Sequence, residues 1–596
     1  MNKWLKKLVG LLLAGVCILG VAGCGQTDAP KGFASVSFLY SGDSEVLAMY
    51  KGLIDTYNEG QGQTDKIFIK AVPTSTGGFD GTLNQKLPSR NGPDLVAITD
   101  EYFKKNCQYL EDLTGIFDDQ YRSEYYEGLE SRYHYNVQTT TSNADDPVYG
   151  LPLYNDTTIL YYNKTALENA GVICISVDEE DLESWNAGNV KDNNGKTKAD
   201  YGIAIDVPAK GYYRSIAPFV AAEGTRDGSG WQKPFSSEVL IFNDRIAMSW
   251  DETEDLGMLL TKTKNDQAST KYGYYTEWWF NYGWSVGGDC LEDLSGNGDW
   301  TFALAGDTPN YIVKEGCTYV GEYTGTTYAA GETLALSDVL NANAGDKISY
   351  YTDDSTEFYY TVNGSKANVR ASLADEESLI QLPSIQEAFA RFCYLTGNGG
   401  LGICPYPSAM NGTSSISYFS TGNVALLVEK ISNFDYLSKN TAFEWGIARL
   451  PIYKTYVDDT DPNCDEVAAE GKVAGHSVGH AICVRKDTSV KEKAITVVRW
   501  LTTEGQRFLA GQGYPSSRKQ DEEIMIDNFA YSNAEIVADS LSTARPGDWW
   551  YMPDRFWIDK WAVPLNNEVR YGKLSFEDYI YKYITVSNQA LADYKV

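Results

Sequence analysis

Aromatic side chains crowd against a glycine pair and a carboxylate in the stretch TEWWFNYGWSVGGD, residues 276–289. Flat rings stack on the apolar faces of a sugar, while carboxylates bind the hydroxyl groups around its edge. The paired glycines let the backbone approach a bound molecule closely. Because side chains alternate along the chain, we expect about half of the rings to pack into a core instead. The residues expected on the ligand side are Trp278, Trp279, Trp284, Gly288 and Asp289.

A second aromatic cluster, RPGDWWYMPDRFW, occupies residues 545–557. Pro546 and Gly547 predict a turn ahead of the rings. The charged side chains of this segment add hydrogen-bonding groups beside the rings, which makes it a candidate second wall for the same ligand. The alternative is a hydrophobic plug where the C-terminal helices dock. The ligand-side candidates here are Arg545, Trp549 and Trp550.

The N-terminal part of the chain alternates between strand and helix patterns. A strand pattern over residues 33–43 ends in a turn, a helix pattern follows, and residues 67–73 and 93–99 are further strand patterns. This order predicts an α/β lobe with a largely parallel sheet, in which ligands bind near the carboxyl ends of the strands. Weaker candidates, at these strand ends and near later strands, are Tyr40, Asp43, Asp100, Tyr154, Asn155, Asp156, Glu429 and Lys430. Because the chain holds 81 acidic residues, solvation at the surface is the default role of any one carboxylate.

Two short motifs invite a metal-binding interpretation, and neither carries a full ligand pattern. GHSVGH spaces His476 and His480 four residues apart, but glycines interrupt any helix there and the glutamate of a zinc-protease motif is missing. DLSGNGDW, residues 293–300, is similar to a calcium loop, yet its twelfth position is Leu304. The sequence contains no phosphate-binding loop and no nucleophile motif. We therefore expect no metal, no cofactor and no catalytic residue.

Charge and length exclude some functions. The formal charge of −31 disfavours nucleic acid and a broad electrostatic grip on anionic lipid, because both need clustered lysine and arginine. At 596 residues the chain is too long for one compact core, so we expect a large two-lobed body or several domains.

The N-terminus has the features of a bacterial secretion signal. Three lysines precede an apolar run over residues 8–19, which is too short for a comfortable membrane span. The run ends in VAGC, which resembles the lipobox of bacterial lipoproteins. That resemblance implies a signal peptide over residues 1–23, a lipid on Cys24 and a tether over residues 24–32. The protein is then anchored by lipid at the outer face of the bacterial cytoplasmic membrane. An ordinary signal peptide or an uncleaved anchor is the alternative.

Eight cysteines remain once Cys17 and Cys24 are set aside: Cys107, Cys174, Cys290, Cys317, Cys393, Cys404, Cys464 and Cys483. An even number outside the cell permits disulfides, but the spacing is wide and contains no CxxC pair. We expect mostly buried thiols with one or two bridges.

The stretch VYGLPLYNDTTILYYNKTALENAGV, residues 148–172, resembles the extracellular solute-binding proteins of carbohydrate ABC importers, family 1. Later segments are similar to motifs of that family in the same order: SWDETEDLGMLLTKTK (249–264), the aromatic loop, SYFSTGNVALLVEKISNFDYL (417–437), FEWGIARLPIY (443–453), the segment 471–518 and the C-terminal aromatic stretch. Each motif is weak alone. Their number and order extend the resemblance over most of the mature chain.

The resemblance implies two α/β lobes joined by a hinge. The first lobe is expected over residues 33–158 and again over 476–525, and the second over 159–475. The C-terminal aromatic loop and helices, 526–596, are expected on the second lobe. Two stretches exceed the family pattern, near 174–245 and 298–380. Alternating polar and β-branched or aromatic residues predict a small β-rich insert in the latter.

The resemblance also implies a binding protein that captures a carbohydrate, with an oligosaccharide as the expected form, and delivers it to the permease of an ABC importer. We expect a monomer, with the membrane contacted only through the N-terminal lipid. Two alternatives stay open. One is a surface hydrolase acting on glycans with two carboxylates. The other is the same fold with a peptide or another polar solute as cargo.

Overall fold

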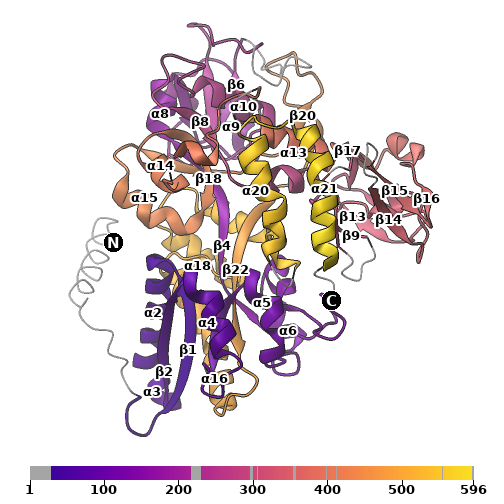
Figure 1. Ribbon diagram of the computed structural model, residues 1–596. Coiled ribbons are helices and arrows are strands. Elements are labelled where there is room, and N and C mark those ends of the chain that lie inside the picture. The colour runs from indigo at the N-terminus through magenta and orange to yellow at the C-terminus, as the bar shows by residue number, and fades with distance from the viewer. Residues whose placement is uncertain are drawn as a thin grey trace.

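The computed structural model describes residues 29–216, 230–294, 300–304, 306–352, 358–396, 399–410, 412–552 and 555–593. The predicted signal peptide, Cys24 and most of the calcium-like loop lie outside these residues. Figure 1 shows two lobes, with β1, β2 and α2 in the lower one and α8, α10 and β8 in the upper one. None of the helices in the described ranges is both long and apolar enough to cross a membrane.

One sheet runs through both lobes, in the order β2-β1-β3-β22-β4-β18-β8, and β19 and β23 pair with β4 and β22. Its strands are β1 (Ala34–Gly42), β2 (Ile67–Ser75), β3 (Leu95–Thr99), β4 (Leu151–Asn163), β8 (Tyr272–Tyr275), β18 (Val424–Lys430), β19 (Trp445–Ala448), β22 (Gly475–Val484) and β23 (Ala544–Arg545). β1 pairs with β2 and β3 in parallel, as the sequence predicts, whereas β22 pairs antiparallel with β3 and β4.

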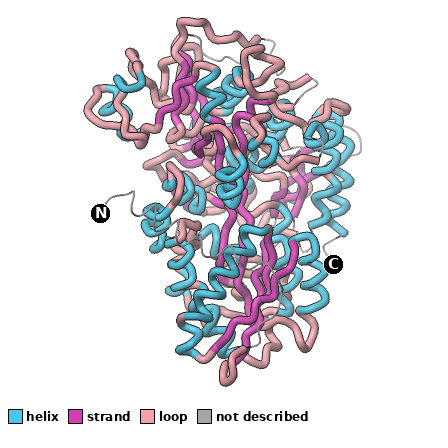
Figure 2. The backbone as a smooth tube through the Cα atoms, turned by 90° about the vertical axis from the view of Figure 1, so that its left-hand side faces the viewer, coloured by secondary structure: helices cyan, strands magenta, loops and turns pink. Residues whose placement is uncertain are grey.

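β4 and β22 are the strands that connect the lobes. The first half of β4 pairs with β22, while residues 158–163 pair with β18 and β19 of the upper lobe. All thirteen residues of β4 are buried, including the polar run from Asn155 to Thr158 at its centre. In the centre of Figure 2 the strands continue from one lobe into the other, with helices beside them.

The lower lobe buries one face of each of its longer helices against the sheet. In α2 (Ser44–Glu59) the buried residues are those of the predicted apolar face, Val46, Met49, Tyr50, Leu53, Ile54 and Tyr57. Its other helices are α3 (Gln61–Asp65), α4 (Phe79–Lys86), α5 (Asp100–Asn106), α6 (Asp119–Arg122), α7 (Glu127–Glu130), α16 (Lys491–Leu501) and α17 (Glu504–Gly511). α2 and α16 share one hydrophobic core with β1, β4 and β22.

The upper lobe contains α8 (Lys164–Asn169), α10 (Trp250–Leu259), α11 (Phe280–Ser285), α13 (Ile385–Tyr394), α14 (Ser415–Ser420), α15 (Phe434–Asn440), α19 (Ala534–Ser542), α20 (Ala562–Pro564) and α21 (Phe576–Asp593). α18 (Glu522–Asn528) packs between α17 of the lower lobe and α19. Ser249 caps α10 in a reciprocal pair with Glu252. Gly171 follows α8 with φ +85°, as expected of a left-handed helix end.

Two groups of small sheets extend the upper lobe. The first contains β5 (Val172–Ile175), β6 (Tyr212–Arg214), β7 (Leu240–Asn243) and α9 (Leu182–Asn186). The second, called the β-insert, contains β10 (Trp300–Phe302), β11 (Asn310–Val313), β12 (Thr318–Val320), β13 (Thr327–Ala329), α12 (Leu336–Val339), β14 (Ile348–Thr352), β15 (Phe358–Val362), β16 (Ser365–Lys366) and β17 (Leu379–Leu382); β9 (Leu291–Asp293) pairs with β10. The β-insert projects sideways in Figure 1. The β-rich character predicted for residues 298–380 is confirmed.

One further pair of short strands lies outside these two groups: β20 (Lys454–Tyr456) pairs with β21 (Val467–Glu470).

The expectation of disulfides was wrong for the described chain. All eight of its cysteines are free thiols, and six of them are buried. Large hydrophobic cores in both lobes make cross-links unnecessary for a chain of this size.

Asp100, a predicted rim residue, forms a buried ion pair beside β22. Arg132 lies 3.1 Å from its carboxylate and also donates to Ser477 at 2.8 Å. The backbone N–H of Gly479 and the hydroxyl of Tyr133 donate to the same carboxylate, at 2.7 and 3.1 Å. Because Asp100 is only 1% exposed, its carboxylate holds β22 in place in this conformation and is not open to a ligand.

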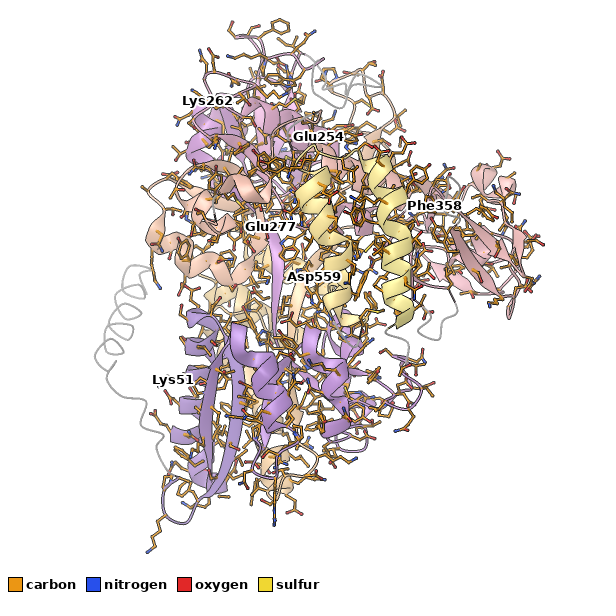
Figure 3. The ribbon with its side chains drawn as sticks, in the orientation of Figure 1. Lys51, Glu254, Lys262, Glu277, Phe358 and Asp559 are labelled. Atoms are coloured by element: carbon orange, nitrogen blue, oxygen red, sulfur yellow. The ribbon has the colours of Figure 1, made fainter. Side chains whose placement is uncertain are left out.

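We predict that Arg132→Leu destabilises the protein by about 3–5 kcal/mol, because it leaves the buried carboxylate of Asp100 without its cation. Urea unfolding of the soluble chain measures this. The matched control is Lys51→Ala, since Lys51 pairs with Asp55 on the exposed face of α2 (Figure 3) and its loss costs at most about 1 kcal/mol. Equal losses in the two variants would contradict the prediction.

Candidate binding site

The two aromatic clusters predicted from the sequence meet beside strand β22. The ring of Trp278 stacks on His476 with centroids 4.5 Å apart, and Trp549 meets the same imidazole edge-on at 5.0 Å. Trp278 and Trp549 lie 6.3 Å apart. His476 is fully buried, whereas both tryptophans are partly exposed. The two indoles therefore present ring surface from one shared cluster.

Local structure explains how distant segments reach this place. β23 pairs in parallel with the start of β22, so that Arg545 lies opposite His476. The turn at Pro546 and Gly547 then leads into a short 3-10 helix, η10 (Asp548–Trp550), that carries Trp549. On the other side, Trp278 lies two residues before the start of α11 in the upper lobe.

A second layer of rings lies behind the first. Trp284 is 1% exposed, stacks on Phe280 at 4.5 Å and donates its indole N–H to Asp289 at 2.8 Å. The guanidinium of Arg545 lies 5.0 Å from the Trp284 ring centre and 4.0 Å from Asp289. Asp289 and Arg545 are both partly exposed and provide polar groups next to the rings.

Trp279 and Trp550 occupy packed positions in this conformation. Trp279 is 6% exposed and meets Trp561 edge-on at 4.9 Å. Trp550 is 8% exposed, donates to the carbonyl of Arg132 at 3.1 Å and packs under the ammonium of Lys104 at 3.9 Å. These contacts match the alternative in which the rings fill a hydrophobic core and do not face a ligand. The ligand roles of Trp279, Trp284 and Trp550 stay predictions.

The weaker candidates are dispersed. Asp43 caps α2 by accepting from the N–H groups of Glu45 and Val46 at 3.0 Å. Three other candidates contact buried residues of the protein itself. Tyr40 packs on Tyr50, Asn155 donates to Ser517, and Glu429 accepts from Ser415. Tyr154 lines a cavity of about 110 Å³ between the start of α2 and residues 431–435.

Asp289, Cys290 and Asp548 form a cluster of titratable groups at the base of the site. Asp548 is fully buried and accepts from the Cys290 thiol at 2.8 Å and from Trp279 at 3.4 Å. Burial, and then the nearby carboxylate of Asp289, raise the pKa of Asp548 well above its usual range. Burial and Asp548 likewise raise the pKa of Cys290.

The ligand atoms of these three residues lie within 4.8 Å of one another, close enough for a metal ion. Metal ligands bind in their deprotonated forms, whereas burial raises the pKa of both Asp548 and Cys290 and so disfavours those forms. This chemistry disfavours a metal ion at the cluster.

Lys430, a weaker candidate from the sequence at the end of a buried strand, lies 5.8 Å from the Trp278 ring centre. Two other groups were not among the predicted binding residues. Lys104 contacts Trp550 from the other lobe, and burial lowers its pKa to about 7. His476 was considered only as a metal ligand. Its packing between two distant aromatic segments has no local signature.

Comparisons with known proteins agree with this architecture. Residues 50–254 match the family model described as bacterial extracellular solute-binding protein, which confirms the predicted resemblance. No curated protein matches the chain significantly.

Three solved structures are similar in fold, each at 13% identity and each covering 94% of this chain. They are an ABC substrate-binding protein from Listeria monocytogenes in complex with cycloalternan (TM-score 0.53, 99% of that chain covered), the GacH receptor of Streptomyces glaucescens, studied with acarbose (0.52, 100%), and a cyclic alpha-maltosyl-1,6-maltose binding protein from Arthrobacter globiformis (0.50, 99%). The predicted fold class, a two-lobed α/β binding-protein fold with insertions, is confirmed.

We predict that Asp548→Asn stabilises the protein at higher pH. A carboxyl group whose folded pKa is raised disfavours the folded state once the unfolded chain ionises, so native stability falls as pH rises above the ordinary aspartate range. The asparagine amide is neutral at every pH and can replace the protonated carboxyl. The gain in thermal midpoint over the native protein should therefore be larger at about pH 8 than at about pH 5.

The control for this prediction is Asp559→Asn, which removes an exposed carboxylate from the same C-terminal segment (Figure 3). Its difference from the native protein should not change between the two pH values. A gain for Asp548→Asn that is the same at both would show that Asp548 is ionised in the folded protein.

Proposed function

We propose that this protein is an extracytoplasmic solute-binding protein that captures an oligosaccharide for an ABC importer. The observation that carries the proposal is the pair of partly exposed indoles, Trp278 and Trp549, held 6.3 Å apart beside the strand that joins the lobes. Such plates bind the apolar faces of sugar rings. The sugar-binding proteins of similar fold support the same class of ligand.

Polar groups around the two indoles match the rim of a sugar. Asp289 accepts hydrogen bonds from hydroxyl groups, while Arg545 and Lys430 donate them. All three side chains are partly exposed at the site. Affinity then comes from ring stacking and paired hydrogen bonds in a cleft that loses water when the lobes close around β4 and β22. The closed form would be the one that docks on the permease, and a monomer suffices for this.

The geometry gives little support to the alternative of a glycan hydrolase. A retaining enzyme places two carboxyl groups roughly 5–5.5 Å apart, both facing the sugar, and an inverting enzyme places them farther apart. Here Asp548 is fully buried and lies against Asp289 and Cys290, so that it has no face toward the cleft. No contact in the site favours a peptide over a sugar.

The decisive experiment titrates the soluble chain, beginning at residue 25, with malto-, xylo- and cello-oligosaccharides and with the corresponding monosaccharides. We expect one series to bind and to be recovered unchanged. Trp278→Ala and Trp549→Ala should each weaken its binding roughly ten- to a hundred-fold, or about 1.4–2.8 kcal/mol, by calorimetry. Phe235→Ala is the control, because Phe235 is 54% exposed and not part of the site. Shortened glycan after incubation would identify an enzyme instead, and binding that survives both substitutions would place the site elsewhere.

The anchoring part of the proposal concerns Cys24. We expect Cys24→Ser to prevent lipidation, so that the chain moves from the detergent phase to the aqueous phase in a detergent-partition assay of expressing cells. Retention of the variant in the detergent phase to the same extent as the native protein would favour the uncleaved anchor.

A further inference from the structure

A cavity of about 530 Å³ separates the β-insert from the aromatic loop, in the range of roughly 300–1,000 Å³ that is usual for small-molecule sites. Gly288 and Asp289 form one wall. Asn310 at the start of β11, Thr333 and Ser337 before and within α12, and Tyr360 of β15 lie on the side of the β-insert. The cavity therefore exists only because the β-insert packs beside this loop.

Close packing fixes the β-insert against the loop. Gly287 has φ +80°, and a Cβ at this position would lie 2.7 Å from the hydroxyl of Thr333. A Cβ on Gly288 would lie 3.1 Å from the amide nitrogen of Asn310, which itself donates to the carbonyl of Pro383. The glycine pair that the sequence suggested for a ligand thus serves first to let the β-insert approach.

The lining of the cavity suits a neutral molecule rich in hydroxyl groups. It contains carboxylates, amides and hydroxyls, represented by Glu292, Asn310 and Thr308, and its described lining includes no lysine, arginine or histidine. Anionic ligands would meet only acidic and neutral groups there. Glu292 accepts from the Tyr360 hydroxyl at 2.6 Å, and burial raises its pKa to about 7, so its carboxyl both donates and accepts near neutrality.

Asp289 connects this cavity to the aromatic site. Its carboxylate accepts from Trp284 and lies 4.0 Å from Arg545 on the aromatic side, and the same residue lines the cavity. A ligand that stacks on the indoles and extends past Asp289 would enter the space under the β-insert. Because the lining offers hydrogen-bonding groups but little ring surface, it would hold outer sugar units by their hydroxyls.

We propose that the cavity under the β-insert is an extension site for a neutral oligosaccharide whose inner units occupy the Trp278–Trp549 site. This inference rests on the proposed function and adds to it: the β-insert selects for chain length. Asp289 forms the boundary between the two parts, and Asn310 and Glu292 bind hydroxyl groups of the outer units.

The test compares short and long members of the glycan series that binds. The native chain should bind the hexasaccharide at least tenfold more tightly than the disaccharide. Ser337→Trp fills the cavity and should reduce the hexasaccharide to the affinity of the disaccharide, while binding of the disaccharide stays unchanged. The matched control is Val320→Trp, which adds the same indole to the outer face of the β-insert, where Val320 is 60% exposed. Thermal midpoints of both variants check that each is folded.

The outcomes distinguish failure of the extension site from failure of carbohydrate binding. Equal affinities for short and long glycans, or a length-dependent gain that survives Ser337→Trp but not Trp549→Ala, would overturn the extension site and leave carbohydrate binding intact. Failure of every glycan to bind the native chain would overturn the proposed function itself.

Discussion

The pairing of β4 with β22 is the constraint on which the rest of this structure depends. Both strands pass between the lobes, and their antiparallel register runs from Ser477 opposite Thr157 to Ile482 opposite Leu151. A shift of one residue would turn every side chain of β22 to the opposite face. His476 would then leave the aromatic cluster, and Gly479 would lose its hydrogen bond to Asp100. The buried Asp100–Arg132 pair thus acts on the binding site through this strand, by fixing where it lies.

His476 shows what that register achieves. Its ring is fully buried between Trp278, Phe280 and Trp549, and burial lowers its pKa well below the usual range, so the imidazole is neutral. Neither of its ring nitrogens has a hydrogen-bond partner in the described part of the chain. Burying polar nitrogens without partners lowers the stability of the folded protein. The same burial places a flat ring under the partly exposed indoles. The imidazole thereby extends the aromatic platform from the upper lobe onto the connecting strand.

Sequence patterns predicted the parts of this architecture that depend on local periodicity. The helix α2 and the β-rich insert both follow from residues close together in the chain. The two aromatic walls were also found, because clusters of indoles are visible without a structure. Which indoles stay exposed was not predictable. Trp279 is covered by Trp561 and Trp284 by Arg545, and both partners are distant in sequence. The cysteines of the described chain need no cross-links because the hydrophobic cores are large. The spacing of cysteines in the sequence gives no information about the size of those cores.

The electrostatics of the site run opposite to those of the whole chain. The protein carries a formal charge of −31, yet Lys104, Lys430 and Arg545 lie over Trp550, Trp278 and Trp284, at 3.9, 5.8 and 5.0 Å from the ring centres. A cation over an indole contributes about 0.5–2 kcal/mol and fixes the orientation of the ring. These cations come from both lobes, with Lys104 on α5, Lys430 on β18 and Arg545 on β23. Under the β-insert, by contrast, the described cavity lining is acidic or neutral. A ligand that spans both regions meets cations beside the indoles and carboxylates, amides and hydroxyls under the β-insert, so groups that both donate and accept hydrogen bonds match the two linings.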